Sequence, residues 1–233
     1  MKVLAIDTST FVLGVALVDE DKVIGEVITN LKKNHSIRLM PAINELMKDA
    51  GVKPKELDRI VVAHGPGSYT GVRIGVTTAK TLAWTLGIPL VGISSLEAVA
   101  QNGRYFNGVV SPIFDARRGQ VYTGLYGAND GMLKNIVEDQ ICMVEDWANH
   151  LNNQYEKVLF LGNDLSIHRD VIKEQLGEKV QFGEFSDHNP RPSELARLGM
   201  KRDPINDIHT FTPNYIRLAE AETNWLAAQK NKA

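Results

Sequence analysis

The chain has 233 residues, 43% of them hydrophobic, so it can bury a core, and wholesale disorder is excluded. Its formal net charge of -2 argues against a basic surface that binds phosphate backbones unaided, so we expect any contact with nucleic acid to be shared with other proteins. Cys142 is the only cysteine and no long apolar run opens the chain, which excludes an internal disulfide and predicts a soluble cytoplasmic protein with no membrane contact.

The first elements form a predicted antiparallel meander. Three short apolar runs with polar turns between them predict strands at residues 3–6, 14–18 and 22–29. A helical pattern follows from Ile37 to Ala50 and stops at Gly51. Pro41 suits only the first turn of a helix, so a start as early as His35 would kink it.

A crossover unit comes next in the chain. It consists of a β-branched strand at residues 58–63, a glycine-rich turn at 65–71, a helix to about Leu86 and a strand at 89–93. Because this order and spacing join parallel strands, part of the sheet is predicted to be parallel. Ser94, one turn ahead of Glu97, then predicts a short capped helix.

The second half repeats this order in a shorter form. Strands are predicted at residues 109–114, 120–126 and 157–161, and helices at 144–151, 166–176, 192–200 and 219–229. The fold class is therefore α/β, with two ribonuclease H-like lobes, each a mixed sheet flanked by helices. Asn102-Gly103 is the expected boundary, which gives lobes at 1–103 and 104–233, with the last helix packing back on the first lobe.

The glycine-rich turn Gly65-Pro66-Gly67-Ser68-Tyr69-Thr70-Gly71 resembles a phosphate cradle at a helix N-terminus. It lacks the Lys-Ser or Lys-Thr ending of a P-loop, so close packing of the helix is favoured over phosphate binding by roughly three to one. Small residues recur along one face of the following helix: Gly71, Gly75, Thr78, Ala79 and Ala83. This face could pack on the chain's own first helix or contribute to a surface for a second protein.

Two further turns occupy the positions where actin-like ATPases hold phosphates. Asp7-Thr8-Ser9-Thr10 follows the first strand, but Phe11 comes next and no glycine opens the loop. Asp115-Ala116-Arg117-Arg118-Gly119 is the second turn, whose arginines could receive an anion, although a charged hairpin turn is favoured by about two to one. The six histidines show no metal-site spacing, and no nucleophile elbow is present.

Several segments in a common order resemble the TsaB (YeaZ) family, which acts in the formation of threonylcarbamoyladenosine in tRNA. The matching segments are Asp7-Thr8-Ser9, His35-Ser36 with Pro41, the run from Gly65 to Gly75, Asp115-Ala116-Arg117 and Pro213-Asn214-Tyr215-Ile216-Arg217. The resemblance implies that the two lobes have an actin-like or Hsp70-like ATPase fold with a decayed nucleotide site, and that the chain is a non-catalytic subunit. With the paralogous protein TsaD and the ATPase TsaE, it would support transfer of threonylcarbamoyl from threonylcarbamoyl-adenylate to N6 of the adenosine beside the anticodon.

The resemblance also implies which residues touch partners. The first two helices would form a four-helix bundle with TsaD, or with a second copy when TsaD is absent, and tRNA would be met through the complex. The implied interface residues are His35, Leu39, Ile43, Met47, Gly71, Arg73, Gly75, Thr78, Ala79 and Leu82.

No metal and no tightly bound cofactor are expected, and ATP or ADP is expected only at the interface of the complex. A shared nucleotide contact is hypothesised for Asp7, Ser9, Arg117 and Arg118. The alternative function is an ATP-dependent small-molecule kinase or a hydrolase, which includes the older glycoprotease label of the family.

Overall fold

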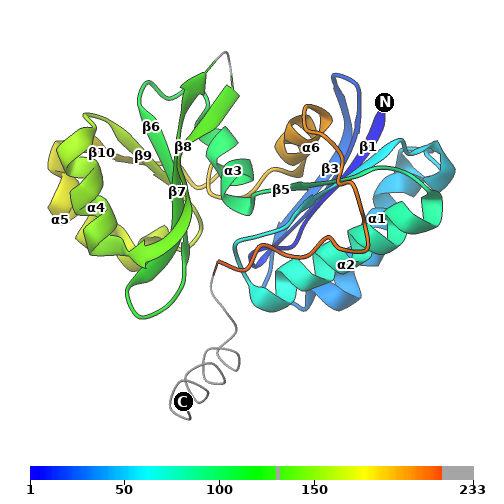
Figure 1. Ribbon diagram of the computed structural model, residues 1–233, viewed down its shortest axis with the longest axis horizontal. Coiled ribbons are helices and arrows are strands. Elements are labelled where there is room, and N and C mark those ends of the chain that lie inside the picture. Colours follow the sequence, from blue (N-terminus) through cyan, green and yellow to red (C-terminus); the bar gives the residue numbers. More distant parts are fainter. Residues whose placement is uncertain (130–131, 217–233) are drawn as a thin grey trace, which may run out of the picture.

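The computed structural model describes residues 1–129 and 132–216, which form two lobes, each built on a five-stranded sheet (Figure 1). The strand order in the first lobe is β3-β2-β1-β4-β5. These strands are β1 (Lys2–Asp7), β2 (Val12–Asp19), β3 (Lys22–Asn30), β4 (Arg59–Ala63) and β5 (Leu90–Ile93). β1, β2 and β3 pair antiparallel, whereas β1, β4 and β5 are parallel, so the predicted mixed sheet is confirmed.

Two helices cover one face of the first sheet: α1 (His35–Asp49) and α2 (Tyr69–Leu86) (Figure 1). α1 begins at His35, capped by the Asn34 side chain, and continues through Pro41. The carbonyl that Pro41 cannot bond belongs to Ile37, on the exposed side of the helix, where water can bond it. α2 begins inside the predicted glycine turn and ends at Gly87, whose φ of 66° is left-handed.

The side chains of β1 point alternately to the two faces of this sheet, and each face is covered by helices. Leu4 and Ile6 point to the face that carries α1 and α2, while Val3 and Ala5 point to the other face. That second face is covered by α6 (Pro192–Met200), through Leu195 among others. A strand buried on both sides reads as a continuous apolar run, as in residues 3–6.

The second lobe has the strand order β10-β9-β6-β7-β8. Its strands are β6 (Val109–Asp115), β7 (Gln120–Asn129), β8 (Met132–Met143), β9 (Val158–Leu161) and β10 (Val180–Phe182), and its outer helices are α4 (Val144–Gln154) and α5 (Leu165–Leu176). β8 and β10 lie where no strand was predicted. Three short 3-10 turns, η1 (Pro54–Glu56), η2 (Gln101–Gly103) and η3 (Gly177–Lys179), complete the elements.

The two lobes exchange one helix each. α3 (Ser95–Ala100) packs with Leu96 and Val99 on Val110 and Tyr126 of the second sheet, although it precedes the expected boundary. α6 returns to the first sheet, although it lies far beyond that boundary. The division into 1–103 and 104–233 is therefore wrong for both helices, because each apolar face is buried against the sheet of the other lobe.

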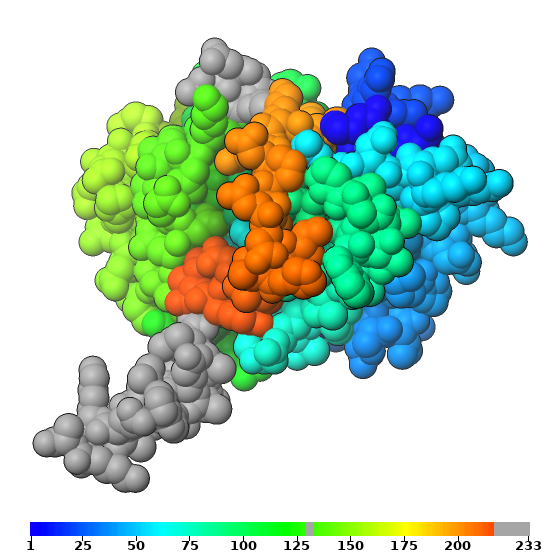
Figure 2. Space-filling view, turned by 45° about the vertical axis from the view of Figure 1, so that its right-hand side comes forward, coloured from blue at the N-terminus to red at the C-terminus, as the bar shows by residue number. Residues whose placement is uncertain are grey.

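Polar contacts join the exchanged helices in the middle of the molecule. Arg104 Nη1 lies 2.7 Å from Glu194 Oε1, and Arg202 Nη2 lies 2.6 Å from Glu97 Oε1. After α6, residues 201–216 run as an extended strap along the first lobe toward the seam between the lobes (Figure 2). Lys80 Nζ anchors the strap by donating to the Phe211 carbonyl at 2.7 Å. The helix predicted at 219–229 lies outside the described residues.

Candidate functional site

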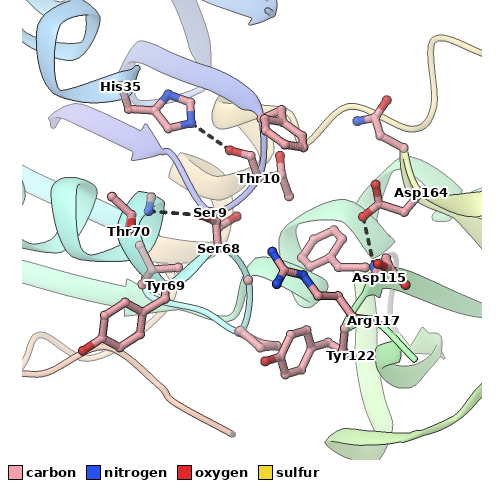
Figure 3. Close-up of a pocket in the computed structure, with 18 of the residues that line it drawn as sticks. Ser9, Thr10, His35, Ser68, Tyr69, Thr70, Asp115, Arg117, Tyr122 and Asp164 are labelled. Atoms are coloured by element: carbon pink, nitrogen blue, oxygen red, sulfur yellow. Dashed lines mark hydrogen bonds between the residues drawn. The ribbon is translucent and has the colours of Figure 1, made fainter. Parts of the chain in front are cut away.

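The seam between the lobes opens into a cleft of about 1330 Å³ (Figure 3). Its first wall holds the loop after β1 and the N-terminal ends of α1 and α2. Its second wall holds the β6-β7 turn and the start of α5, and the end of the strap closes one side. The three turns singled out in the sequence therefore meet at one cavity.

The loop after β1 is closed by its own hydrogen bonds. Asp7 is fully buried, and its Oδ1 accepts from the backbone N of Ser9 at 2.8 Å and from Ser9 Oγ at 2.7 Å. Asp7 Oδ2 has no partner among the described residues, and burial raises the pKa of this carboxyl above its usual range. Ser9 lines the cleft but Asp7 does not, so the structure does not bring Asp7 to a shared nucleotide contact.

The glycine-rich segment packs against this same loop. The backbone N of Ser68 donates to the Ser9 carbonyl at 2.7 Å, and the N of Gly71 donates to Ser68 Oγ at 3.3 Å. A Cβ at Gly71 would lie 2.2 Å from the Thr8 carbonyl, and one at Gly67 would lie 2.2 Å from the Ser9 carbonyl. Close packing is thus what these glycines provide, and two backbone donors of this segment, those of Ser68 and Gly71, are already bonded within the protein.

The turn between β6 and β7 is built differently. Arg117 and Arg118 have φ of 65° and 55°, in the left-handed region that residues with a Cβ seldom adopt. Both side chains are exposed, and neither makes an ion pair within residues 1–129 and 132–216. Arg117 points into the cleft (Figure 3). The structure therefore brings Ser9, Arg117 and Arg118 to one cavity, and their contact with a nucleotide stays a prediction.

Two residues that the sequence analysis did not single out hold the second wall. His168 is buried on α5 and its Nε2 lies 3.0 Å from Asp115 Oδ1. Asp164 Oδ2 accepts from the backbone N of Asp115 at 2.9 Å (Figure 3). The turn Gly162-Asn163-Asp164 after β9 was visible in the sequence, but nothing in it indicated a contact with residue 115.

Most of the residues expected at a partner interface on α1 and α2 face inward. The side chains of Leu39, Ile43 and Met47 are buried on the first sheet, and Ala79 is fully buried. His35 is 8% exposed and bonds the Thr10 carbonyl. In the single chain these residues are buried, so their place at a partner interface stays a prediction: His35, Leu39, Ile43, Met47, Gly71, Gly75 and Ala79.

The outer face of the two helices carries other side chains. Of the expected set, Arg73 is exposed, and Thr78 and Leu82 are half-buried. Ile37 and Met40, which were not assigned to the interface, are 71% and 46% exposed. The apolar residues of α1 span more than one face, and this excess was the signal in the sequence that could have pointed to an outer surface.

An apolar groove of about 230 Å³ runs between α1 and α2 at the end away from the cleft. Apolar side chains supply most of its lining: Met40, Ile43, Met47, Leu57, Leu82 and Leu86. The outer helix face and this groove together form an apolar surface that a helix of another protein can contact.

The described residues offer few groups suited to covalent or metal chemistry. No cluster of three or more His, Cys, Asp or Glu side chains is placed to hold a metal ion in that part of the chain. Burial raises the pKa of the half-buried Cys142 thiol to about 11, so it is protonated near neutral pH. No described helix is both long and apolar enough to cross a membrane.

The two lobes with exchanged helices and facing turns define the class: a two-lobed, actin-like ATPase fold whose first-lobe phosphate turns are filled by the protein. The ROK hexokinase of Thermus thermophilus shares this fold, with a TM-score of 0.50 and 11% identity over 86% of this chain and 100% of that chain. YeaZ from Pseudomonas aeruginosa superposes with a TM-score of 0.78 and 25% identity, over 92% of this chain and 99% of that chain.

Sequence comparison narrows this class to one family. Residues 22–225 match the family model described as TsaD, tRNA N6-adenosine threonylcarbamoyltransferase. The tRNA threonylcarbamoyladenosine biosynthesis protein TsaB of Bacillus subtilis is 56% identical, over 99% of this chain and 100% of that protein. TsaB of Escherichia coli is 34% identical, over 54% of this chain and 55% of that protein. The chain belongs to the TsaB family.

Proposed function

We propose that this chain is the TsaB subunit that its host requires to form threonylcarbamoyladenosine in tRNA. The observation that carries the proposal is the end-to-end identity of 56% with the Bacillus subtilis protein of that name. In this role the chain works in the cytoplasm as a non-catalytic partner. The group transferred is threonylcarbamoyl, from threonylcarbamoyl-adenylate to N6 of the adenosine beside the anticodon, in tRNAs that read codons beginning with A.

The closed first-lobe loop supports a non-catalytic role. An ATPase of this fold needs free donors and accessible carboxylates around the phosphates. Here Ser9 and Ser68 bond one another through their backbones, and Asp7 is buried behind Ser9. A kinase or hydrolase would instead turn over ATP as the purified chain alone and lose that activity on Asp7→Ala.

The outer face of α1 and α2 supports TsaD as the direct partner. Ile37 and Met40 present exposed apolar area there, next to the groove between the helices. The same face is the surface for a homodimer when TsaD is absent. TsaE and tRNA join through the assembled complex.

ATP or ADP is proposed to bind only after assembly, with Arg117 and Arg118 contributing charge from the second wall. Calorimetric titration of ATP into the isolated chain and into the complex with TsaD and TsaE tests this. Heat in the complex alone is expected, and equal binding by the isolated chain contradicts the proposal.

Depletion of the protein in its host is the experiment that tests the function. Threonylcarbamoyladenosine in bulk tRNA, measured by mass spectrometry, is expected to fall as the protein is lost and to return when the gene is restored. A normal level of the modified nucleoside after depletion would contradict the proposed function.

A further inference from the structure

The cleft between the lobes has a charge opposite to that of the chain as a whole. Four cationic side chains line it, Lys32, Lys33, Arg117 and Arg118, against two acidic ones, Asp115 and Asp164. Both acids are engaged, since Asp115 faces His168 and Asp164 accepts from the Asp115 backbone. The complete chain has two more acidic than basic residues, so the cations are concentrated here.

Exposed aromatic rings stand among these cations. Phe11 is 60% exposed, with Lys32 Nζ 5.9 Å from its ring centroid. On the other side Tyr69 and Tyr215 are 45% and 38% exposed, with ring centroids 5.1 Å apart, and the Arg73 guanidinium lies 4.6 Å from the Tyr69 ring. Each cation lies over its ring, and a base can stack on the aromatic surface that stays exposed while its phosphate is neutralised nearby.

We propose that this cleft binds a single-stranded segment of RNA, with Lys32, Lys33, Arg117 and Arg118 on phosphates and Phe11, Tyr69 and Tyr215 stacking on bases. The inference deepens the proposed function, on which it rests, because it gives this chain a direct contact with the RNA substrate. The low net charge of the whole chain does not oppose it, since the cations are gathered at one groove.

Two observations favour a strand over a mononucleotide. The cleft of about 1330 Å³ exceeds the range of roughly 300–1,000 Å³ that small-ligand sites occupy. A triphosphate is held by backbone donors at a helix N-terminus, and here Ser68 and Gly71 already use theirs within the protein. Side-chain cations on two facing walls suit phosphates spaced along a strand.

An acidic protein segment could also pair with these cations. The exposed aromatic rings favour RNA over such a segment as the occupant of the cleft. Carboxylates gain nothing from an exposed ring face, whose quadrupole is negative. Bases of a single strand do gain, because unstacked bases find a new stacking partner there. RNA binding should therefore depend on Phe11 as well as on the charges.

The test is fluorescence anisotropy on the full-length chain, alone and with TsaD, using labelled single-stranded RNA of about ten nucleotides, within the span of known single-strand grooves. Four phosphate contacts predict a slope of about -3 for log affinity against log salt. The double variant Lys32→Glu with Arg117→Glu, one residue from each wall, should weaken binding about 20-fold or more. Phe11→Ala should weaken it by about tenfold, and Phe11→Trp should restore it.

The control variant is Lys157→Glu with Lys173→Glu, which makes the same charge change at two exposed positions outside the cleft. It should stay within threefold of the wild type, by the ordinary tolerance for distant surface charges. An equal loss in both double variants would overturn the proposal, as would displacement of the RNA from the isolated chain by stoichiometric ATP. Binding of polyglutamate with no effect of Phe11→Ala would assign the cleft to an acidic protein segment instead. If RNA does not bind while tRNA modification still requires the chain, this inference fails and the proposed function stands.

Discussion

The two turns that face one another across the cleft differ in where their polar and charged groups point. In the first lobe the loop at residues 7–10 directs its polar groups inward, onto itself and onto the glycine segment of α2. In the second lobe the turn at residues 115–119 keeps Asp115 fixed by neighbours and leaves Arg117 and Arg118 free to point outward. The first turn is closed by its own contacts, while its counterpart has two exposed arginine side chains at the cleft.

The difference shows that a glycine-rich segment has to be interpreted through its neighbour. Gly67 and Gly71 each sit where a Cβ would meet a backbone oxygen of the first loop, so their role is to let α2 approach β1. In the other turn, the left-handed backbone conformation of Arg117 and Arg118 costs some energy. Strained backbone of this kind is typical of ligand-binding sites.

The largest expected effect comes from filling the first-lobe contact. Gly71→Ala places a methyl group 2.2 Å from the Thr8 carbonyl, so we expect the free energy of unfolding to fall by about 3 kcal/mol, at the upper end of overpacking. Urea denaturation measures it. Gly87→Ala is the control, because a Cβ at Gly87 meets nothing within 4 Å. Only the left-handed φ should then lower the free energy of unfolding, by about 1–2 kcal/mol. Equal losses in the two variants would contradict the packing role.

The next effect separates the inner and outer faces of the first-lobe helices. Ile37→Asp changes a side chain that is 71% exposed, so the free energy of unfolding should stay within about 0.5 kcal/mol. Binding to TsaD should weaken about 30-fold or more, as for an interface hot spot. Calorimetry with purified TsaD measures this, and Ile136→Asp, at a 50% exposed position on β8, is the control. Unchanged affinity for TsaD would remove this face from the proposed interface.

Asp7→Asn tests whether the buried carboxyl is neutral in the folded protein. Burial raises its folded pKa above the ordinary value of 3.8, so between these two values the folded state keeps a proton that the unfolded state has lost. Through that window the contribution of Asp7 to stability falls as pH rises. The variant should therefore gain stability relative to the wild type as pH increases from about 4 to 7. A stability difference between the variant and the wild type that stays constant over that range, measured by urea denaturation, would show that Asp7 is charged in the folded protein.

The smallest effect concerns the second-lobe turn. Arg118→Gly relieves a left-handed φ of 55°, so the free energy of unfolding should rise by about 1 kcal/mol. The same change should weaken RNA binding, because it removes a cation from the cleft. Thermal unfolding and anisotropy on the same preparation measure the two effects. A destabilised variant would show that the arginine side chain supports the turn.

Much of the fold could be predicted because its strands are short apolar runs between polar turns, as at residues 3–6. β8 could not, because residues such as Lys134, Glu138 and Asp139 interrupt its pattern and its order comes from pairing with β7. The exchange of α3 and α6 between the lobes could not be predicted from the sequence either, because the apolar pattern of a helix does not identify the sheet on which it packs.

The turns that form the candidate site could be predicted from the sequence, but the sequence did not show which sides of α1 and α2 face the protein core and which face outward. Ala79 reads as an interface residue because burial on the chain's own sheet and burial against a partner give the same helical spacing. The contact between Gly71 and Thr8 could not be predicted either. The two residues lie far apart in the sequence and come together only when β1 pairs with β4. His168 carried no signal until α5 placed it beside Asp115.

Reconstitution in vitro tests the central claim most directly. Purified TsaD, TsaE, unmodified tRNA, ATP and threonylcarbamoyl-adenylate are combined with this chain, and threonylcarbamoyladenosine is measured by mass spectrometry. We expect product only when the chain is present, full product with Asp7→Asn, and little with Ile37→Asp. Equal product without the chain, or loss of product with Asp7→Asn while the complex still assembles, would contradict a subunit that acts by binding through its outer helix face.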